Sequence, residues 1–84
     1  MERYFIVRNL EWDTDGKKIK GLPKEVGVCA DEDDVEEWIE NECDQEEIEY
    51  YIMDWLTDEY EWCIAGCEIT EVTEEEYKEW EGLK

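Results

Sequence analysis

Residues 31–61 read DEDDVEEWIENECDQEEIEYYIMDWLTDEYE, a stretch in which apolar residues at helical spacing are interspersed with acidic residues and no cation. In its first part, the apolar residues follow the i, i+3, i+4, i+8 pattern of an amphipathic helix: Val35, Trp38, Ile39 and Cys43. The acidic run Asp31–Asp34 supplies N-cap candidates for that helix. The pattern predicts a helix with an apolar side for the core and an acidic side for the solvent.

A second helix is predicted to begin at Asp44, because the run Asp44–Glu47 resembles a capping box. Its apolar stripe comprises Ile48, Tyr51, Ile52, Trp55 and Leu56. The spacing leaves two arrangements open, which are two helices with a kink and one continuous rod. Trp38 and Trp55 lie on the two apolar stripes and are therefore expected in the core.

Two strands are predicted before this helical region. Residues 3–12 form the first, and one of its faces comprises Tyr4, Ile6, Leu10 and Trp12. Asp13–Gly16 has turn chemistry, because glycine adopts positive φ easily and Asp side chains bond their own backbone. Pro23 then opens a second strand at about 23–30, an arrangement that suits an edge strand. Its alternating apolar residues are Val26, Val28 and Ala30.

A third strand and a short terminal helix are predicted after the helical region. Trp62–Val72 has the alternation of a strand, with one face made up of Cys63, Ala65, Cys67 and Ile69. Thr73–Glu76 is a further capping box. It begins a helix that carries Tyr77 and Trp80 and stops at Gly82.

The predicted order of elements is therefore β-β-α-α-β-α, in one α+β domain that spans residues 1–84. A chain of 84 residues is too short for two independent cores. A right-handed crossover places the second and third strands parallel to each other, on either side of the first. We therefore expect a small three-stranded antiparallel or mixed sheet in the order 2-1-3, with the helices packed on one face.

The charge of the chain is strongly negative and unevenly distributed. Asp and Glu number 28 against eight Lys and Arg, for a formal net charge of −20, and no cation occurs from Glu25 to Tyr77. Five Trp and five Tyr residues argue against a disordered acidic segment. Such a surface repels nucleic acid and anionic membranes and attracts basic protein surfaces. A simpler role for the charge is solubility.

The residue inventory argues against an enzyme. The chain has no His and no Ser, so Ser-His triads, histidine bases and histidine metal sites are impossible. None of its glycines fits a phosphate-binding loop. A cysteine nucleophile would lack a histidine base and would lie in a negative field that disfavours the thiolate.

No metal or cofactor is expected. The four cysteines lack the C-x-x-C spacing of zinc sites and fall on apolar stripes, where Cys packs as a small hydrophobic residue. Asp13, Asp15 and Gly16 resemble the start of a calcium loop but lack its later ligands, which favours a turn. Without a signal peptide or a membrane span, we expect a cytoplasmic protein with reduced thiols.

The acidic stretch carries the sharpest functional hypothesis. Sixteen acids lie between Asp31 and Glu61, and in a continuous helix they would be spaced roughly 3 Å apart along the axis. One DNA strand presents a charge every ~3.4 Å. The chain is therefore interpreted as a monomeric or weakly dimeric acidic binder of a basic protein surface, with a DNA-mimic inhibitor of a nucleic-acid-binding protein as its specific form. The expected partner-binding residues are Asp31, Asp33, Asp34, Glu36, Glu37, Glu40, Glu46, Glu47 and Trp80.

Two alternatives remain open at this point. One is a small interaction or structural module that uses an exposed aromatic patch around Tyr77 and Trp80, residue types that are enriched in binding hot spots. The other is a solvated helix face that is acidic without a partner. The absence of Lys four residues from these acids works against helix stability, which favours a role for the charge other than folding.

Several motifs resemble a family of small acidic proteins of unknown function from bacterial and phage-derived genomes. They are, in chain order, Trp12-Asp-Thr-Asp-Gly16, Leu22-Pro23, Trp55-Leu-Thr-Asp-Glu-Tyr60 and Trp62-Cys63-Ile64. The resemblance spans roughly residues 4 to 70. This chain carries extra helical sequence at about 36–50, and Glu61 stands where the family often has Gly. The resemblance implies a fold and a mobile-element setting, and it implies no activity and no site.

Overall fold

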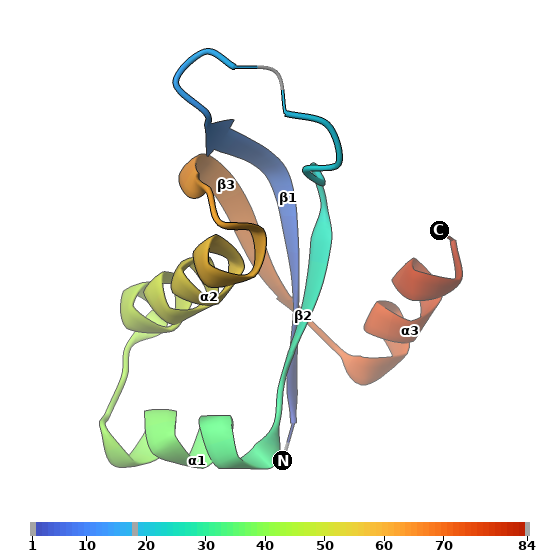
Figure 1. Ribbon diagram of the computed structural model, residues 1–84. Coiled ribbons are helices and arrows are strands. Elements are labelled where there is room, and N and C mark those ends of the chain that lie inside the picture. The colour runs from blue at the N-terminus through green and yellow to red at the C-terminus, as the bar shows by residue number, and fades with distance from the viewer. Residues whose placement is uncertain (1, 18, 84) are drawn as a thin grey trace.

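The computed structural model describes residues 2–17 and 19–83 (Figure 1). Its elements are β1 (Arg3–Asp13), β2 (Val26–Ala30), α1 (Glu32–Glu40), α2 (Gln45–Tyr60), β3 (Cys63–Val72) and α3 (Glu74–Gly82). The central strand β1 pairs antiparallel with β2 and with β3, which lie at the two edges. The α+β class, the element order and the 2-1-3 strand order predicted from the sequence are confirmed.

Helices α1 and α2 pack on one face of the sheet (Figure 1) and enclose the hydrophobic core. Phe5 and Val7 of β1 and Ile52 of α2 are completely buried there. Trp38 stacks on Trp55, with 5.8 Å between the ring centroids, so the two predicted stripes meet in the core. The core residues are Phe5, Val7, Leu10, Ala30, Val35, Trp38, Ile48, Ile52 and Leu56.

The acidic stretch forms two separate helices rather than one rod. Glu42, in the connection between them, adopts positive φ (51°). Asp44 then caps α2, because its carboxylate accepts a hydrogen bond of 2.9 Å from the backbone N–H of Glu47. Asp31 caps α1 in the same way through Asp34. Each helix therefore begins at the Asp cap predicted for it, and the two axes point in different directions (Figure 1).

Helix α3 lies on the opposite face of the sheet, whereas the helices were all expected on one face (Figure 1). Its capping box is formed as predicted, between Thr73 and Glu76. The aromatic side chains of Tyr77 and Trp80 lie directly over Gly27 of β2, where a Cβ atom would come within 2.5 Å of the Trp80 ring. The missing side chain of Gly27 therefore provides the space in which α3 packs.

A β-bulge in β1 explains why one predicted strand face is wrong. The pairing with β3 shifts between Arg8 and Glu11, and Asn9 adopts positive φ (53°). One extra residue reverses the alternation of the side chains. Ile6 therefore faces α3, while Leu10 belongs to the core on the α1 and α2 face. The predicted common face of Tyr4, Ile6, Leu10 and Trp12 is split between the two sides of the sheet.

A second irregularity, between Gly66 and Ile64 of β3, has the same consequence. Cys67 and Ile69 pack against the core as predicted, and Ile64 joins them. Cys63 and Ala65, which were expected on that face, are exposed. The remaining strand, β2, alternates as predicted but begins only at Val26. Within the described ranges, no helix has the length and hydrophobicity needed to cross a membrane.

Candidate functional site

The acidic side chains of residues 31–61, here called the carboxylate surface, are carried by α1, α2 and the segments that cap and connect these helices. Because Val35, Trp38 and Ile52 point toward the sheet, the opposite sides of both helices are left to solvent. Fourteen of the sixteen acids are exposed, Asp34 and Glu49 are half-buried, and none is buried. The array is thus carried by the two helices that enclose the core.

The predicted partner-binding acids fall into two adjacent groups on this surface. Along α1, residues at three- and four-residue intervals share one side of the helix: Asp33, Glu36, Glu37 and Glu40. Glu46 and Glu47 lie in the first turn of α2, directly after the short connection from α1. All six are exposed, as is the cap Asp31. The two helices thus bring together the acids predicted for this site.

Trp80, the ninth predicted residue, lies elsewhere. It is on α3, across the sheet from α1 and α2, and is half-buried against Gly27. Its indole N–H donates a hydrogen bond to the Glu25 carboxylate. Tyr77 packs beside it, with 5.8 Å between the ring centroids. Trp80 is therefore part of the packing of α3 and lies apart from the carboxylate surface.

Three ion pairs join described residues that lie outside residues 31–61. Arg3 pairs with Glu71 at 2.6 Å, Arg8 with Glu25 at 3.8 Å and Lys78 with Glu74 at 3.0 Å. In the sequence, all eight Lys and Arg residues lie outside this stretch together with 12 acids, whereas the stretch itself has 16 acids and no Lys or Arg. The negative charge is therefore concentrated on the α1 and α2 layer.

Burial and, to a smaller extent, neighbouring carboxylates raise the pKa of two groups in this layer. Partial burial and the neighbouring Asp31 carboxylate raise the pKa of Asp34 above the ordinary value. Burial, together with the nearby Glu47 carboxylate, raises the pKa of the Cys43 thiol. Both shifts favour the protonated form, which is the response expected in a negative local potential.

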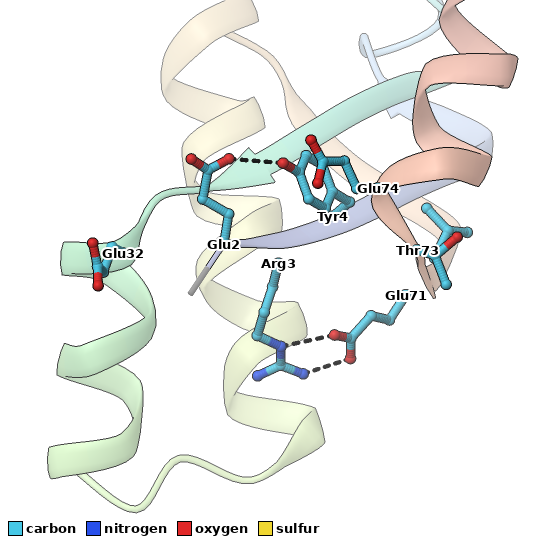
Figure 2. Close-up of a pocket in the computed structure, with 8 residues that line it drawn as sticks. Glu2, Arg3, Tyr4, Glu32, Glu71, Thr73 and Glu74 are labelled. Carbon is cyan, nitrogen blue, oxygen red and sulfur yellow. Dashed lines mark hydrogen bonds and ion pairs between the residues drawn. The ribbon is translucent and has the colours of Figure 1, made fainter.

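A cleft beside the start of α1 extends the acidic region (Figure 2). Its volume is about 530 Å³, and four glutamates from three parts of the chain line it: Glu2, Glu32, Glu71 and Glu74. The one cation among the described lining residues, Arg3, donates hydrogen bonds of 2.8 and 2.6 Å to Glu71. No sequence pattern predicts this cleft, because only the folded chain brings these segments together.

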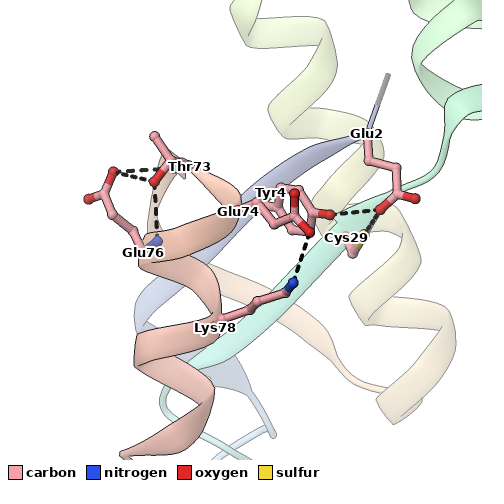
Figure 3. A network of polar contacts seen from close by, with 7 residues as sticks. All are labelled: Glu2, Tyr4, Cys29, Thr73, Glu74, Glu76 and Lys78. Carbon is pink, nitrogen blue, oxygen red and sulfur yellow. Dashed lines mark hydrogen bonds and ion pairs between the residues drawn. The ribbon is translucent and has the colours of Figure 1, made fainter.

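Tyr4 and the β2 thiol of Cys29 share one carboxylate at the edge of this cleft (Figure 3). Tyr4 donates a hydrogen bond of 2.8 Å to Glu2, which raises the pKa of the phenol, and the Cys29 sulfur lies 3.5 Å from the same oxygen. Burial and Glu2 also raise the pKa of Cys29. Such a thiol is held in its protonated, weakly nucleophilic form.

The cysteines are dispersed over the fold. Cys29 faces α3, Cys43 and Cys67 pack against the core, and Cys63 is exposed at the start of β3. Burial also raises the pKa of Cys67. Over residues 2–17 and 19–83, no three Cys, Asp or Glu side chains are grouped so that they could hold a metal ion. The aspartates at 13 and 15 take part in a turn, in which Thr14 donates a hydrogen bond to the Lys17 carbonyl.

Two exposed tyrosines also lie on α2 among the acids. Tyr50 is 65% exposed and Tyr51 40% exposed, and their rings meet edge to face with 6.4 Å between centroids. The apolar stripe predicted for α2 includes Tyr51, and no sequence pattern distinguishes Tyr50. The spacing of apolar residues along a helix indicates which of them can face the core. The packing of the helix on the sheet determines which of them do.

Comparison of the chain with protein-family models, with curated proteins and with solved structures finds no match. The functional proposal below is therefore built on the surface chemistry of the chain.

Proposed function

We propose that this chain is a non-enzymatic acidic binding protein whose carboxylate surface engages a basic surface on another protein. The observation that carries this proposal is the exposure of 14 acidic side chains on two adjoining helices, their caps and the connection between them, in a stretch of 31 residues without a cation. Like charges at helical spacing destabilise a helix by a few tenths of a kcal/mol per pair. A basic partner offsets that repulsion, and the negative potential of the surface steers the partner toward it.

The specific form of the proposal is a DNA mimic that inhibits a nucleic-acid-binding protein. A DNA-binding protein follows phosphates on both sides of a groove that is about 12 Å wide. Two adjoining helices, each roughly 10 Å in diameter, spread carboxylates over a comparable breadth. We place the protein in the cytoplasm, where four unpaired thiols stay reduced.

The proposal is tested by capture of a partner and by two matched charge variants. Immobilised protein is exposed to a bacterial lysate, bound proteins are eluted with a salt gradient, and the affinity of the purified partner is then measured. The first variant carries five amides on the carboxylate surface: E36Q, E37Q, E40Q, E46Q and E47Q. The control variant removes the same charge elsewhere: E11Q, D15N, E68Q, E75Q and E79Q.

We expect the first variant to bind the partner on the order of tenfold more weakly, and the control to stay within about threefold of the native chain. Equal losses of affinity in both variants would show that the partner responds to the net charge of the protein and not to the position of the acids. The DNA-mimic form additionally requires that the protein displace a fluorescent DNA duplex from its partner. Simultaneous binding of the duplex and the protein would exclude that form.

A further inference from the structure

The outer edge of β2 is an unprotected strand edge. Because β2 pairs only with β1, alternate residues direct their backbone N–H and C=O groups away from the sheet. The strand reads Val-Gly-Val-Cys-Ala, without a charged residue, and its register with β1 runs through five consecutive pairs without a shift. The opposite edge, β3, carries Glu68 and Glu71 and an irregular register, features that protect an edge from pairing.

A groove runs beside this open edge, on the side of the sheet where α2 lies. Its volume is about 310 Å³, and the residues that line it are Val26, Gly27, Val28, Trp55, Leu56, Glu59 and Tyr60. Helix α2 packs closer to β3 than to β2 (Figure 1). Val26 and Val28 are consequently only half-buried, so apolar surface is accessible next to free backbone hydrogen-bonding groups.

We propose that the β2 edge and this groove form a binding site for an extended basic peptide segment of a partner protein, which adds as a fourth strand beside β2. Peptides bind in this way when main-chain hydrogen bonds supply affinity and a neighbouring groove accepts alternate side chains. Val26 and Val28 share the face that looks toward Trp55 and Leu56. Every second side chain of the added strand contacts this apolar groove, and a segment of about five residues matches the length of β2.

The charges around the groove select a basic peptide. Glu59 lines the groove, Asp31 follows the last residue of β2, and no Lys or Arg is among the described residues that line the groove. A second copy of this chain is disfavoured as the occupant. Its own β2 carries no cation, and pairing would bring together two chains that each have a net charge of −20. Glu36, Glu37 and Glu40 are not among the described residues that line the groove, so the groove can bind a peptide even if these acids have no partner.

The probe is the capped heptapeptide Lys-Val-Lys-Val-Lys-Val-Lys, titrated into isotope-labelled full-length protein at about 150 mM salt. We expect the largest amide chemical-shift changes at residues 26–30 and 55–60. Shift changes confined to residues 31–47 would mean that the peptide only neutralises carboxylates, and they would overturn the proposal. A peptide-free dimer that forms through residues 26–30 would also overturn it, because the edge would then serve a second copy.

Two N-methylated peptides test the backbone hydrogen bonds without altering the protein. Consecutive residues of a strand direct their N–H groups to opposite sides. One peptide is methylated at the valine amides and the other at the lysine amides. The peptide whose methyl groups face β2 should bind at least tenfold more weakly, and the other should change less than threefold. Equal affinities of the two methylated peptides would contradict strand addition.

A pair of protein variants separates this site from the acids of α1 and of the first turn of α2. E59K should weaken binding of the heptapeptide about fivefold, because it reverses the charge in the groove. The five-amide variant of α1 and α2 should keep the peptide affinity within about threefold. A larger loss in the five-amide variant than in E59K would assign the peptide to the acids of α1 and of the first turn of α2, and it would overturn the groove proposal.

Discussion

The two faces of the sheet are covered in different ways. Helices α1 and α2 enclose an aliphatic and aromatic core, in which Phe5, Val7 and Ile52 are completely buried. Helix α3 has no buried residue and is held by two half-buried aromatic rings over a glycine. The carboxylate surface is thus carried by the better-packed face, which is expected to open last in local unfolding. Its acids are therefore held by the more stable face, whereas α3 is expected to open more readily.

The largest expected effect comes from breaking the α1 and α2 face. Ile52 is fully buried in the core, so I52A should lower the free energy of unfolding by about 3–4 kcal/mol, through lost burial and the cavity that remains. W80A removes a larger side chain from the α3 face but should cost only about 1–2 kcal/mol, since that ring is half-buried. Urea denaturation measures both. If W80A and I52A lowered the free energy of unfolding equally, the two faces would contribute equally to stability.

The next largest effect tests how α3 is held. In G27A the added methyl group would lie 2.5 Å from the Trp80 ring and 2.7 Å from the Tyr77 ring, so α3 must shift, at a cost of about 1–3 kcal/mol. Amide hydrogen exchange should show faster exchange in α3 while α1 and α2 keep their protection. G66A is the control, because the nearest atom to its methyl group is the flexible Glu11 carboxylate at 3.3 Å. Unchanged protection of α3 in G27A would contradict its assigned role.

A smaller effect, of opposite sign, sharpens the description of the acidic layer. Glu61 caps the C-terminus of α2 with φ of 63°, a left-handed conformation that favours glycine. E61G should therefore raise the free energy of unfolding by about 1 kcal/mol, and it also removes a negative charge from the helix C-terminus. D58G removes the same charge within α2 but should destabilise by about 1 kcal/mol. Thermal denaturation distinguishes the two, and a destabilised E61G would contradict the strain assigned to this cap.

The smallest effect concerns the Arg3–Glu71 pair, which spans β1 and β3. The hydrogen bonds from Arg3 hold the pKa of Glu71 below its ordinary value. The stabilisation is therefore present above the ordinary pKa of Glu and is lost as pH falls through the lower, folded-state pKa. Because the carboxylate is 41% exposed, E71Q should cost only about 0.5 kcal/mol at neutral pH. In urea denaturation this cost should shrink progressively as pH falls below the ordinary pKa of Glu, and a cost that does not change with pH would indicate a contribution other than charge.

Local sequence signals determine most of this fold. The caps at Asp44 and Thr73 and the helical stripes of apolar residues are each contained within a few consecutive positions, so the elements and their order could be predicted. The bulge at Asn9 could not, because one inserted residue reverses a strand's faces without altering its composition. The position of α3 depends on Gly27, which is distant in sequence from the two rings that lie over it.

The candidate site was predictable to a similar extent. The exposure of the acids follows from their spacing opposite the apolar stripes, so Glu36, Glu37 and Glu40 were found from the sequence. The cleft beside α1 is lined by the start of β1, the end of β3 and the first residues of α1 and α3. Only the tertiary structure brings these ends together. The open edge of β2 was suggested by Pro23, but the adjoining groove depends on where α2 packs.

The salt dependence of partner binding tests whether the carboxylate surface is what a partner recognises. The dissociation constant of the captured partner would be measured for the native chain between about 50 and 500 mM NaCl, a range over which screening of exposed charges becomes strong. We predict that the affinity falls by at least tenfold over this range. An affinity that stays constant across the range would contradict binding through the carboxylate surface.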